Sequence, residues 1–218
     1  MFKRLLLGLA LLMAGLSVQA ADPALPAAAP GALFTELRPP LPTENDNKIE
    51  VIEFFWYGCP HCYAIEPYVD EWLKHKPADV NFVRVPAMFN AQWAVAGRVF
   101  YALESMGLVN RLHRPLFDAI HKDHLRITDE DQLKDWLNRQ GVDVAKFQAA
   151  LHSFTVESKV KRATQLTELS RIDGVPSMIV DGRYLVSLGQ VQSPTRLMQV
   201  VDQQIAVARK GMKAPAKK

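Results

Sequence analysis

The chain has 218 residues, two cysteines and a formal net charge of +3. A balance this close to neutral gives no general electrostatic case for nucleic-acid binding. A chain of this length builds a sufficient core without a disulfide staple, and we expect one domain with room for an insertion.

The first twenty residues form a segment of their own. Lys3 and Arg4 precede a Leu-rich apolar run that ends at Val18-Gln19-Ala20. This pattern predicts a secretory signal peptide, residues 1–20, cleaved after Ala20. The alternative is a membrane anchor, but the run is shorter than the ~20 residues that a membrane span needs. We therefore expect export into an oxidising compartment, where disulfides persist.

The segments that follow predict a strand–helix–strand unit within residues 33–88. Residues 21–32 are rich in Pro and Ala and predict a flexible leader. "LFTEL" indicates a short edge strand. Ile49–Tyr57 is rich in β-branched and aromatic residues and reads as a strand buried on both faces. Val80–Val85 indicates the second strand of the unit.

The helix of this unit is expected to begin at Pro60, because proline suits the first helical turn. Pro67 lies within it and is expected to kink it. At helical spacing its buried side would carry Cys62, Ile65, Val69, Trp72 and Leu73.

Residues 89–171 show a helical pattern throughout and predict an inserted helical domain. Within it, Thr128 is the expected N-cap of one helix and Gly141 its stop. β character returns in residues 172–210, where Asp181-Gly182 marks a hairpin turn. A last helix is expected from Pro194 to Lys210, followed by a flexible basic tail over residues 211–218.

The two cysteines, Cys59 and Cys62, allow three interpretations: a metal clip, a staple or a redox pair. Structural zinc needs four ligands, and only His121 and His124, three residues apart, offer to complete such a site. A c-type haem requires His after the second cysteine, where Tyr63 stands. A staple closing so short a loop constrains the unfolded chain little. The redox interpretation is favoured, and no metal or cofactor is expected.

A reactive pair at a helix start has a definite polarity. The i, i+3 spacing puts both sulfurs on one face of the helix. Cys59 would lie at the helix N-terminus, where free backbone N–H groups, the helix dipole and the neighbouring His61 lower the pKa of its thiol. A stabilised thiolate makes the disulfide a stronger oxidant. Cys59 is thus expected to form the mixed disulfide with substrate, and Cys62 to resolve it.

Glu53 lies six residues before Cys59 on the strand expected to be buried. Two interpretations stay open: an acid at an exposed strand end, or a buried proton acceptor and donor for Cys62. Arg84, in the apolar "FVRV", is the candidate partner of the Glu53 carboxylate, because a buried charge needs one. Its alternative is a snorkelling residue at the sheet edge.

The segments "VIEFFWYGCPHCY" and "GVPSMIV" together resemble the DsbA family of bacterial periplasmic thiol:disulfide oxidases. The resemblance runs from about Leu33 to Arg209. It implies an α/β thioredoxin fold with a helical domain inserted between its βαβ and ββα halves. It also implies that Val175-Pro176 is a cis-proline loop that faces the cysteines and presents the Val175 backbone to substrate. Spacing alone predicts only a turn there.

The family further implies the partners of the protein. They are reduced, unfolded proteins newly exported to the periplasm, and a DsbB-like, quinone-linked inner-membrane oxidase that restores the disulfide. One departure stands out. Gly58 occupies a position that is often aromatic in the family, which predicts a smaller apolar surface unless Trp56 and Tyr57 reach the surface instead.

Two competing functions remain. A disulfide isomerase or reductase of this fold usually carries an N-terminal dimerisation domain, and only residues 21–32 precede the first expected strand, so a monomer is expected. A peptide-binding chaperone or metal-delivery module without turnover belongs to another class. Its activity in cells would survive replacement of Cys59.

Overall fold

The structure, a computed structural model, describes residues 33–44 and 47–213. The expected signal peptide and leader lie outside the described residues. Within them, five strands form one sheet: β1 (Thr35–Glu36), β2 (Ile49–Phe55), β3 (Val80–Pro86), β4 (Ser177–Val180) and β5 (Tyr184–Ser187). The helices are α1 (Pro60–His75), α2 (Ala91–Ser105), α3 (Val109–His121), α4 (Glu130–Arg139), α5 (Val144–Leu151), α6 (Phe154–Ser170), α7 (Leu188–Val191) and α8 (Pro194–Lys213).

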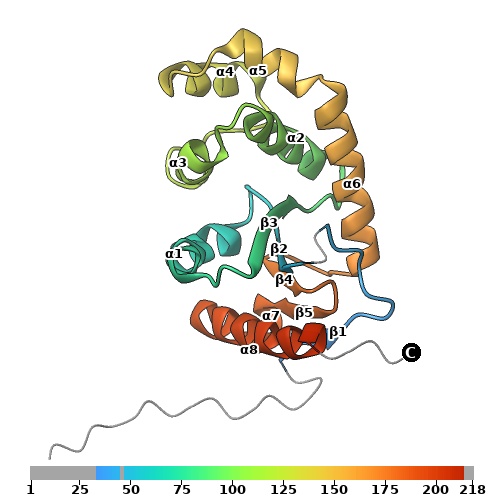
Figure 1. The fold of residues 1–218 in the computed structure, drawn as a ribbon. Coiled ribbons are helices and arrows are strands. Elements are labelled where there is room, and N and C mark those ends of the chain that lie inside the picture. The colour runs from blue at the N-terminus through green and yellow to red at the C-terminus, as the bar shows by residue number, and fades with distance from the viewer. Residues whose placement is uncertain (1–32, 45–46, 214–218) are drawn as a thin grey trace, which may run out of the picture.

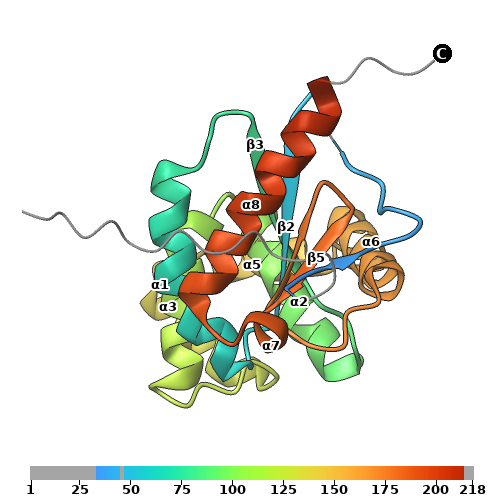
Figure 2. The same ribbon diagram turned by 90° about the horizontal axis from the view of Figure 1, so that it is seen from below.

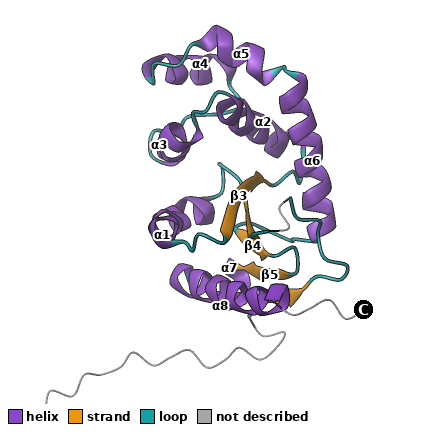
Figure 3. Ribbon diagram, viewed as in Figure 1, coloured by secondary structure: helices purple, strands orange, loops and turns teal. Residues whose placement is uncertain are grey.

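The sheet is assembled from both ends of the chain, in the order β1-β5-β4-β2-β3. β2 lies in its interior, parallel to β3 and antiparallel to β4. Helices α2–α6 come between β3 and β4 in the chain and form a separate group of helices in Figures 1 and 3. The α/β fold with a helical domain inserted between a βαβ and a ββα half is thereby confirmed.

The two faces of the sheet are covered by different helices. α1 and α8 pack on one face, and the helical group lies on the other (Figures 1 and 2). Because side chains alternate along a strand, Ile49 and Val51 of β2 enter the core shared with α1 and α8. Ile52 and Phe54 enter the core shared with α2 and α6. The alternation places Glu53 on the α1 side of the sheet.

α1 differs from the expected helix in what it buries. It runs unbroken past Pro67 and buries Cys62, Ile65 and Val69 as expected. Trp72 and Leu73 are only half-buried, because they pack at the margin of the core shared with α8. Glu66 is also fully buried in α1, next to Ile65, and the sequence pattern did not predict this.

Several element boundaries also differ from those expected. β2 ends at Phe55 rather than Tyr57, because a turn begins at Trp56, whose carbonyl accepts a hydrogen bond from the backbone N–H of Cys59 at 3.0 Å. The N-cap of α4 is Asp129 rather than Thr128, since the Asp129 carboxylate accepts from the N–H of Gln132.

The prediction of a flexible tail is wrong for residues 211–213, because α8 continues through Gly211 to Lys213. A Cβ at Gly211 would meet no other atom within 4 Å, so no packing contact there ends the helix. The turn positions are confirmed. Gly141, Asp181 and Gly182 all have positive φ, of 68°, 53° and 64°. Among the described residues, none of the helices combines the length and the apolar character that crossing a bilayer requires.

Candidate redox site

Cys59 and Cys62 lie at the first turn of α1. Cys59 is the N-cap residue, with extended backbone angles, and Pro60 follows in the first helical turn. The Cys59 sulfur accepts a hydrogen bond from the backbone N–H of Cys62 at 3.3 Å. Both side chains are free thiols in this structure. Cys59 keeps 8% of its surface exposed and Cys62 none, so Cys59 is the sulfur nearer to solvent.

The two thiols have opposite acidities. A hydrogen bond from the Cys62 side chain is the largest of the effects that lower the pKa of Cys59 to about 6, against the opposing effect of burial. The backbone N–H groups of Cys62 and His61 and the electrostatic effect of the His61 side chain add to it. Burial is the main cause that raises the pKa of Cys62 well above its usual range. Near neutral pH the pair is therefore one thiolate and one thiol.

The loop before β4 brings Val175 and Pro176 to this pair. The Val175–Pro176 peptide bond is cis, and the Cys59 thiol lies 3.5 Å from the Val175 carbonyl oxygen as a hydrogen-bond donor. A groove of about 680 Å³ runs along the loop. Its lining includes His61, Ala64, Val175, Pro176 and Leu188. The expected site residues other than Glu53 thus lie close together. His61, Val175 and Pro176 line the groove, and Cys59, Pro60 and Cys62 form the start of α1 beside it.

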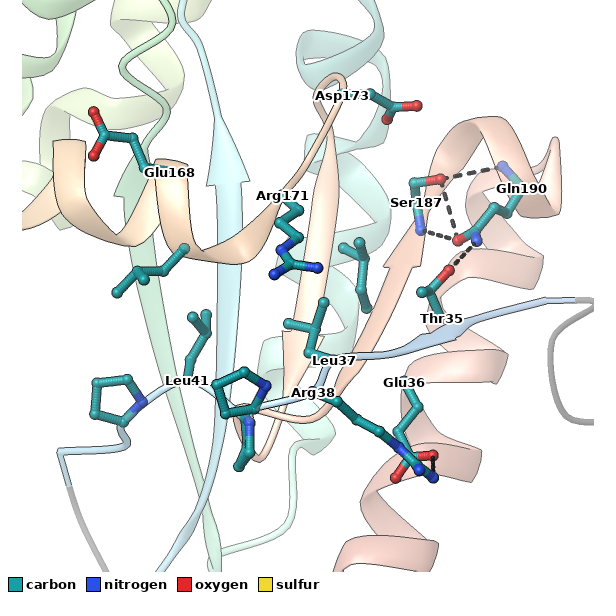
Figure 4. A pocket seen from close by; sticks show the side chains of 15 residues that line it. Thr35, Glu36, Leu37, Arg38, Leu41, Glu168, Arg171, Asp173, Ser187 and Gln190 are labelled. Atoms are coloured by element: carbon teal, nitrogen blue, oxygen red, sulfur yellow. Dashed lines mark hydrogen bonds and ion pairs between the residues drawn. The ribbon is translucent and has the colours of Figure 1, made fainter.

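A second groove, of about 660 Å³, lies on the far side of Ser187 and Gln190 (Figure 4). Ser187 caps α7 reciprocally with Gln190, and the Gln190 amide donates to the Thr35 hydroxyl at 2.9 Å, which fixes the wall between the grooves. Arg38 and Arg171 lie along this second groove, and no cysteine or histidine does. We therefore place the candidate chemistry at the first groove, whose lining residue Val175 contacts Cys59.

Glu53 is fully buried, so it is not an acid at an exposed strand end. Arg84 Nε lies 3.1 Å from Glu53 Oε2, as an ion pair without the alignment of a hydrogen bond. Arg84 Nη2 also reaches Glu66 Oε2 at 3.4 Å. Burial is the main cause that raises the pKa of both Glu53 and Glu66 to about 7. The expected pairing of Glu53 with Arg84 is confirmed, and Glu66 is a third member of the cluster.

Glu66 and His113 were missed from the sequence. Glu66 follows Cys62 by four residues, so it lies on the same buried side of α1, a signal that helical spacing offers. His113, on α3, hydrogen-bonds the Tyr57 hydroxyl through Nδ1 at 2.9 Å and lies 3.4 Å from Glu66 Oε1 through Nε2. Burial lowers the pKa of His113 to about 3, so its ring is neutral.

The environment of Gly58 corrects the expectation about Tyr57. Tyr57 is buried, with 1% of its surface exposed, and does not reach the surface. Trp56 is half-buried, and its indole stacks on that of Trp93 with ring centroids 4.3 Å apart. The indole lies over Gly58, so a side chain at position 58 would collide with it. An aromatic surface is thus present beside Cys59, supplied from position 56.

His121, considered above as a zinc ligand, uses its Nε2 to bond the Tyr57 carbonyl oxygen at 2.8 Å. His124 is exposed. Among the described residues, no group of three or more His, Cys, Asp or Glu side chains is arranged to hold a metal ion.

Comparisons with known proteins show which family the chain resembles along most of its length. Residues 78–201 match the family model described as DSBA-like thioredoxin domain. A thiol:disulfide interchange protein DsbA of Pseudomonas syringae pv. tomato is 42% identical over 200 residues, which is 92% of each chain. The protein of the same name in Bordetella parapertussis is 41% identical over 178 residues, 81% of this chain and 85% of its own.

Solved structures give the same answer for the fold. The crystal structure of Pseudomonas aeruginosa DsbA has a TM-score of 0.82 and 39% identity, covering 86% of this chain and 97% of that chain. The oxidoreductase DsbA of Xylella fastidiosa has a TM-score of 0.78 at 28% identity, covering 86% and 100%. The family match begins after Cys62, whereas the 200-residue alignment is too long to leave the two cysteines out.

Proposed function

The chain belongs to the DsbA family of thiol:disulfide oxidoreductases, and from that membership we propose that it is a periplasmic dithiol oxidase. It donates the Cys59–Cys62 disulfide to newly exported proteins. The observation that carries this proposal is the asymmetry of the two sulfurs. Cys59 caps a helix, contacts the carbonyl of Val175 in the groove wall and has a pKa lowered to about 6, whereas Cys62 is fully buried and stays protonated.

The reaction follows from this asymmetry. A substrate thiolate attacks Cys59 Sγ, the Cys59–Cys62 bond breaks, and a mixed disulfide forms at Cys59. The Cys62 sulfur leaves with the electron pair and takes up a proton. A second substrate thiolate then attacks the substrate sulfur of the mixed disulfide, and Cys59 leaves as a thiolate. The substrate loses two electrons and the protein gains them. Stabilisation of the Cys59 thiolate favours this direction.

Glu53 is proposed as the proton acceptor and donor for Cys62. It is buried on the α1 side of β2, and its negative charge is among the causes that raise the pKa of Cys62. A carboxyl group whose own pKa is about 7 holds a proton about half of the time at neutral pH. It can therefore give a proton to the departing Cys62 sulfur and take it back on reoxidation.

The groove along Val175 and Pro176 is proposed to hold an extended stretch of the substrate. The backbone of Val175 points at Cys59 and is placed to pair with a peptide. His61 and Leu188 also line this groove. The reduced protein then needs an oxidant, and we propose a DsbB-like, quinone-linked enzyme of the inner membrane. The protein acts as a monomer in this scheme.

The redox equilibrium of the purified protein with a glutathione series tests this function. A strongly oxidising pair is expected, and a strongly reducing pair would overturn the proposal. Two variants test the polarity. With oxidised glutathione, reduced Cys62→Ser should accumulate a mixed disulfide at Cys59 and release one glutathione, while Cys59→Ser should accumulate none. Equal trapping by both variants would show that the assignment of the attacking sulfur is wrong.

A further inference from the structure

Tyr57 is the second residue of the turn that leads from β2 into Cys59. In that turn the Cys59 N–H bonds the Trp56 carbonyl at 3.0 Å. Tyr57 lies beyond the end of β2, so the strand ladder no longer satisfies its carbonyl group. A buried carbonyl without a partner is unfavourable. The position of this turn therefore depends on what else binds Tyr57.

Helix α3 binds Tyr57 at its hydroxyl group and at its backbone carbonyl group. The hydroxyl group hydrogen-bonds His113 Nδ1 at 2.9 Å. The backbone carbonyl oxygen lies 2.8 Å from His121 Nε2. Because a carbonyl oxygen only accepts, the His121 ring must carry its proton on Nε2. One residue is thus held by its side chain and its main chain from a single helix.

The residues of α3 that do this are evenly spaced. His113, Phe117 and His121 recur every four residues, which places them along one side of the helix. The Phe117 ring packs edge-on against the Tyr57 ring at 4.9 Å. The His121 ring also stacks on Tyr63 of α1, with centroids 4.7 Å apart and an interplanar angle of 7°. α3, which lies next to α1 in Figure 1, therefore contacts the turn before Cys59 and the helix after it.

We propose that His121, and His113 through the Tyr57 hydroxyl, are positioning residues that fix the Cys59 sulfur over the backbone N–H groups at the start of α1. The thiolate of Cys59 is stabilised by those donors only while the turn holds its orientation. The inserted helical domain thereby contributes to the oxidising strength of the pair. The inference deepens the proposed dithiol oxidase activity and rests on it.

Two substitutions at one position separate the hydrogen bond from the ring. His121→Phe keeps a flat ring against Tyr63 and Phe117 but has no donor for the Tyr57 carbonyl. His121→Gln loses the ring but keeps an N–H donor at a similar reach. The measurements are the thiolate titration of Cys59 by absorbance near 240 nm and the redox equilibrium with glutathione. His152→Gln, an exposed histidine at the end of α5, is the control.

His121→Phe is expected to raise the pKa of Cys59 by roughly 0.5 to 1 unit and to make the pair about three- to tenfold less oxidising. His121→Gln is expected to stay nearer to the wild-type protein in both measurements. A Cys59 titration and a redox constant unchanged in folded His121→Phe would overturn the inference. So would equal losses in His121→Phe and His121→Gln, because the ring rather than the hydrogen bond would then matter.

A third variant tests the inference if His121→Phe does not fold. Tyr57→Phe removes only the hydroxyl oxygen that bonds His113. It should shift the Cys59 titration in the same direction, and an unchanged titration would overturn the inference. Failure of the proposed function would look different, because the wild-type protein itself would then be strongly reducing.

Discussion

The Trp56 indole occupies the space that a side chain at position 58 would need. A Cβ atom added to Gly58 would lie 2.5 Å from Cζ2 of that indole, closer than such atoms approach in proteins. The indole has little freedom to retreat, because it is stacked on the indole of Trp93, with ring centroids 4.3 Å apart. Glycine is therefore required at position 58 by its own neighbour, and it does not mark a missing aromatic surface.

Gly58→Ala is expected to destabilise the protein by about 1–3 kcal/mol, the usual cost of an added methyl group in a packed site. The free energy of unfolding, from urea titration, is the measurement. Gly211→Ala is the matched control, because a Cβ at Gly211 meets open space, and it should be neutral or slightly stabilising. The cost of Gly58→Ala should shrink in a Trp56→Ala background, and an undiminished cost there would contradict this account.

The stability of the reduced protein should depend on pH through Cys59. The folded-state pKa of Cys59 is lowered from its usual value of 9.0 to about 6. A lowered acid pKa gives stability that is fully present above the unfolded pKa and is lost as pH falls through the folded one. The free energy of unfolding of the reduced protein should therefore fall relative to that of the oxidised protein between about pH 9 and pH 6.

Urea unfolding of both redox forms across this range is the measurement. Glu53 and Glu66 titrate in both forms, so the difference between the forms isolates the cysteines. A difference that does not change with pH would show that the Cys59 thiolate is not stabilised in the folded protein.

Glu53→Gln should slow disulfide transfer to a reduced model peptide at pH 7 by about tenfold. This is less than the ~10²–10⁴ of many proton-transfer groups, because a thiolate leaves without full protonation. The pH–rate profile should also lose the step near pH 7 that the pKa of Glu53 would give it. Glu50→Gln is the control: Glu50 is also buried on β2 but faces the other side of the sheet. Equal effects of the two substitutions would exclude a specific role for Glu53.

Arg84→Met should be costly at neutral pH, because it leaves Glu53 and Glu66 buried together without a cation. Removing one partner of a buried ion pair typically costs about 3–5 kcal/mol. Arg98→Met breaks a surface pair with Glu157 and should cost about 1 kcal/mol or less.

The loss of unfolding free energy caused by Arg84→Met should become smaller as the pH is lowered from 7.5 to 5. Arg84 holds down the pKa of both carboxyl groups, so its removal raises their folded pKa values further above the unfolded value, and the variant gains more stability than the wild-type protein as pH falls. Urea titrations at the two pH values would check this. A cost that is the same at both would mean that the two carboxylates are not the source of the destabilisation.

The local features of the site were predictable from the sequence, and the long-range ones were not. The start of α1 at Pro60 and the placing of Cys59 as its cap follow from neighbouring residues alone. Glu53 on the α1 side of β2 follows from the two-residue period of a strand. The Val175 contact with Cys59 was implied only by family resemblance, since the residues themselves predict just a turn.

The contacts of α3 had no local signal. His113 and His121 lie 56 and 64 residues from Tyr57 in the chain, and their meeting depends on how the inserted domain docks. The surroundings of Gly58 could not be predicted for the same reason. Its neighbour Trp56 is fixed by Trp93, a residue of α2 whose position no local pattern reveals.

The assembly of the sheet from both chain ends has a consequence for the newly made protein. The residue whose carbonyl meets Cys59, Val175, is 116 positions further along the chain. At synthesis rates of about 5–20 residues per second, that distance takes roughly 6–23 s to make. During that interval the helix start that acidifies Cys59 can form, but β2 still lacks β4 and the groove has no far wall. The nascent chain therefore carries a reactive thiol before it carries the surface that selects what the thiol reacts with.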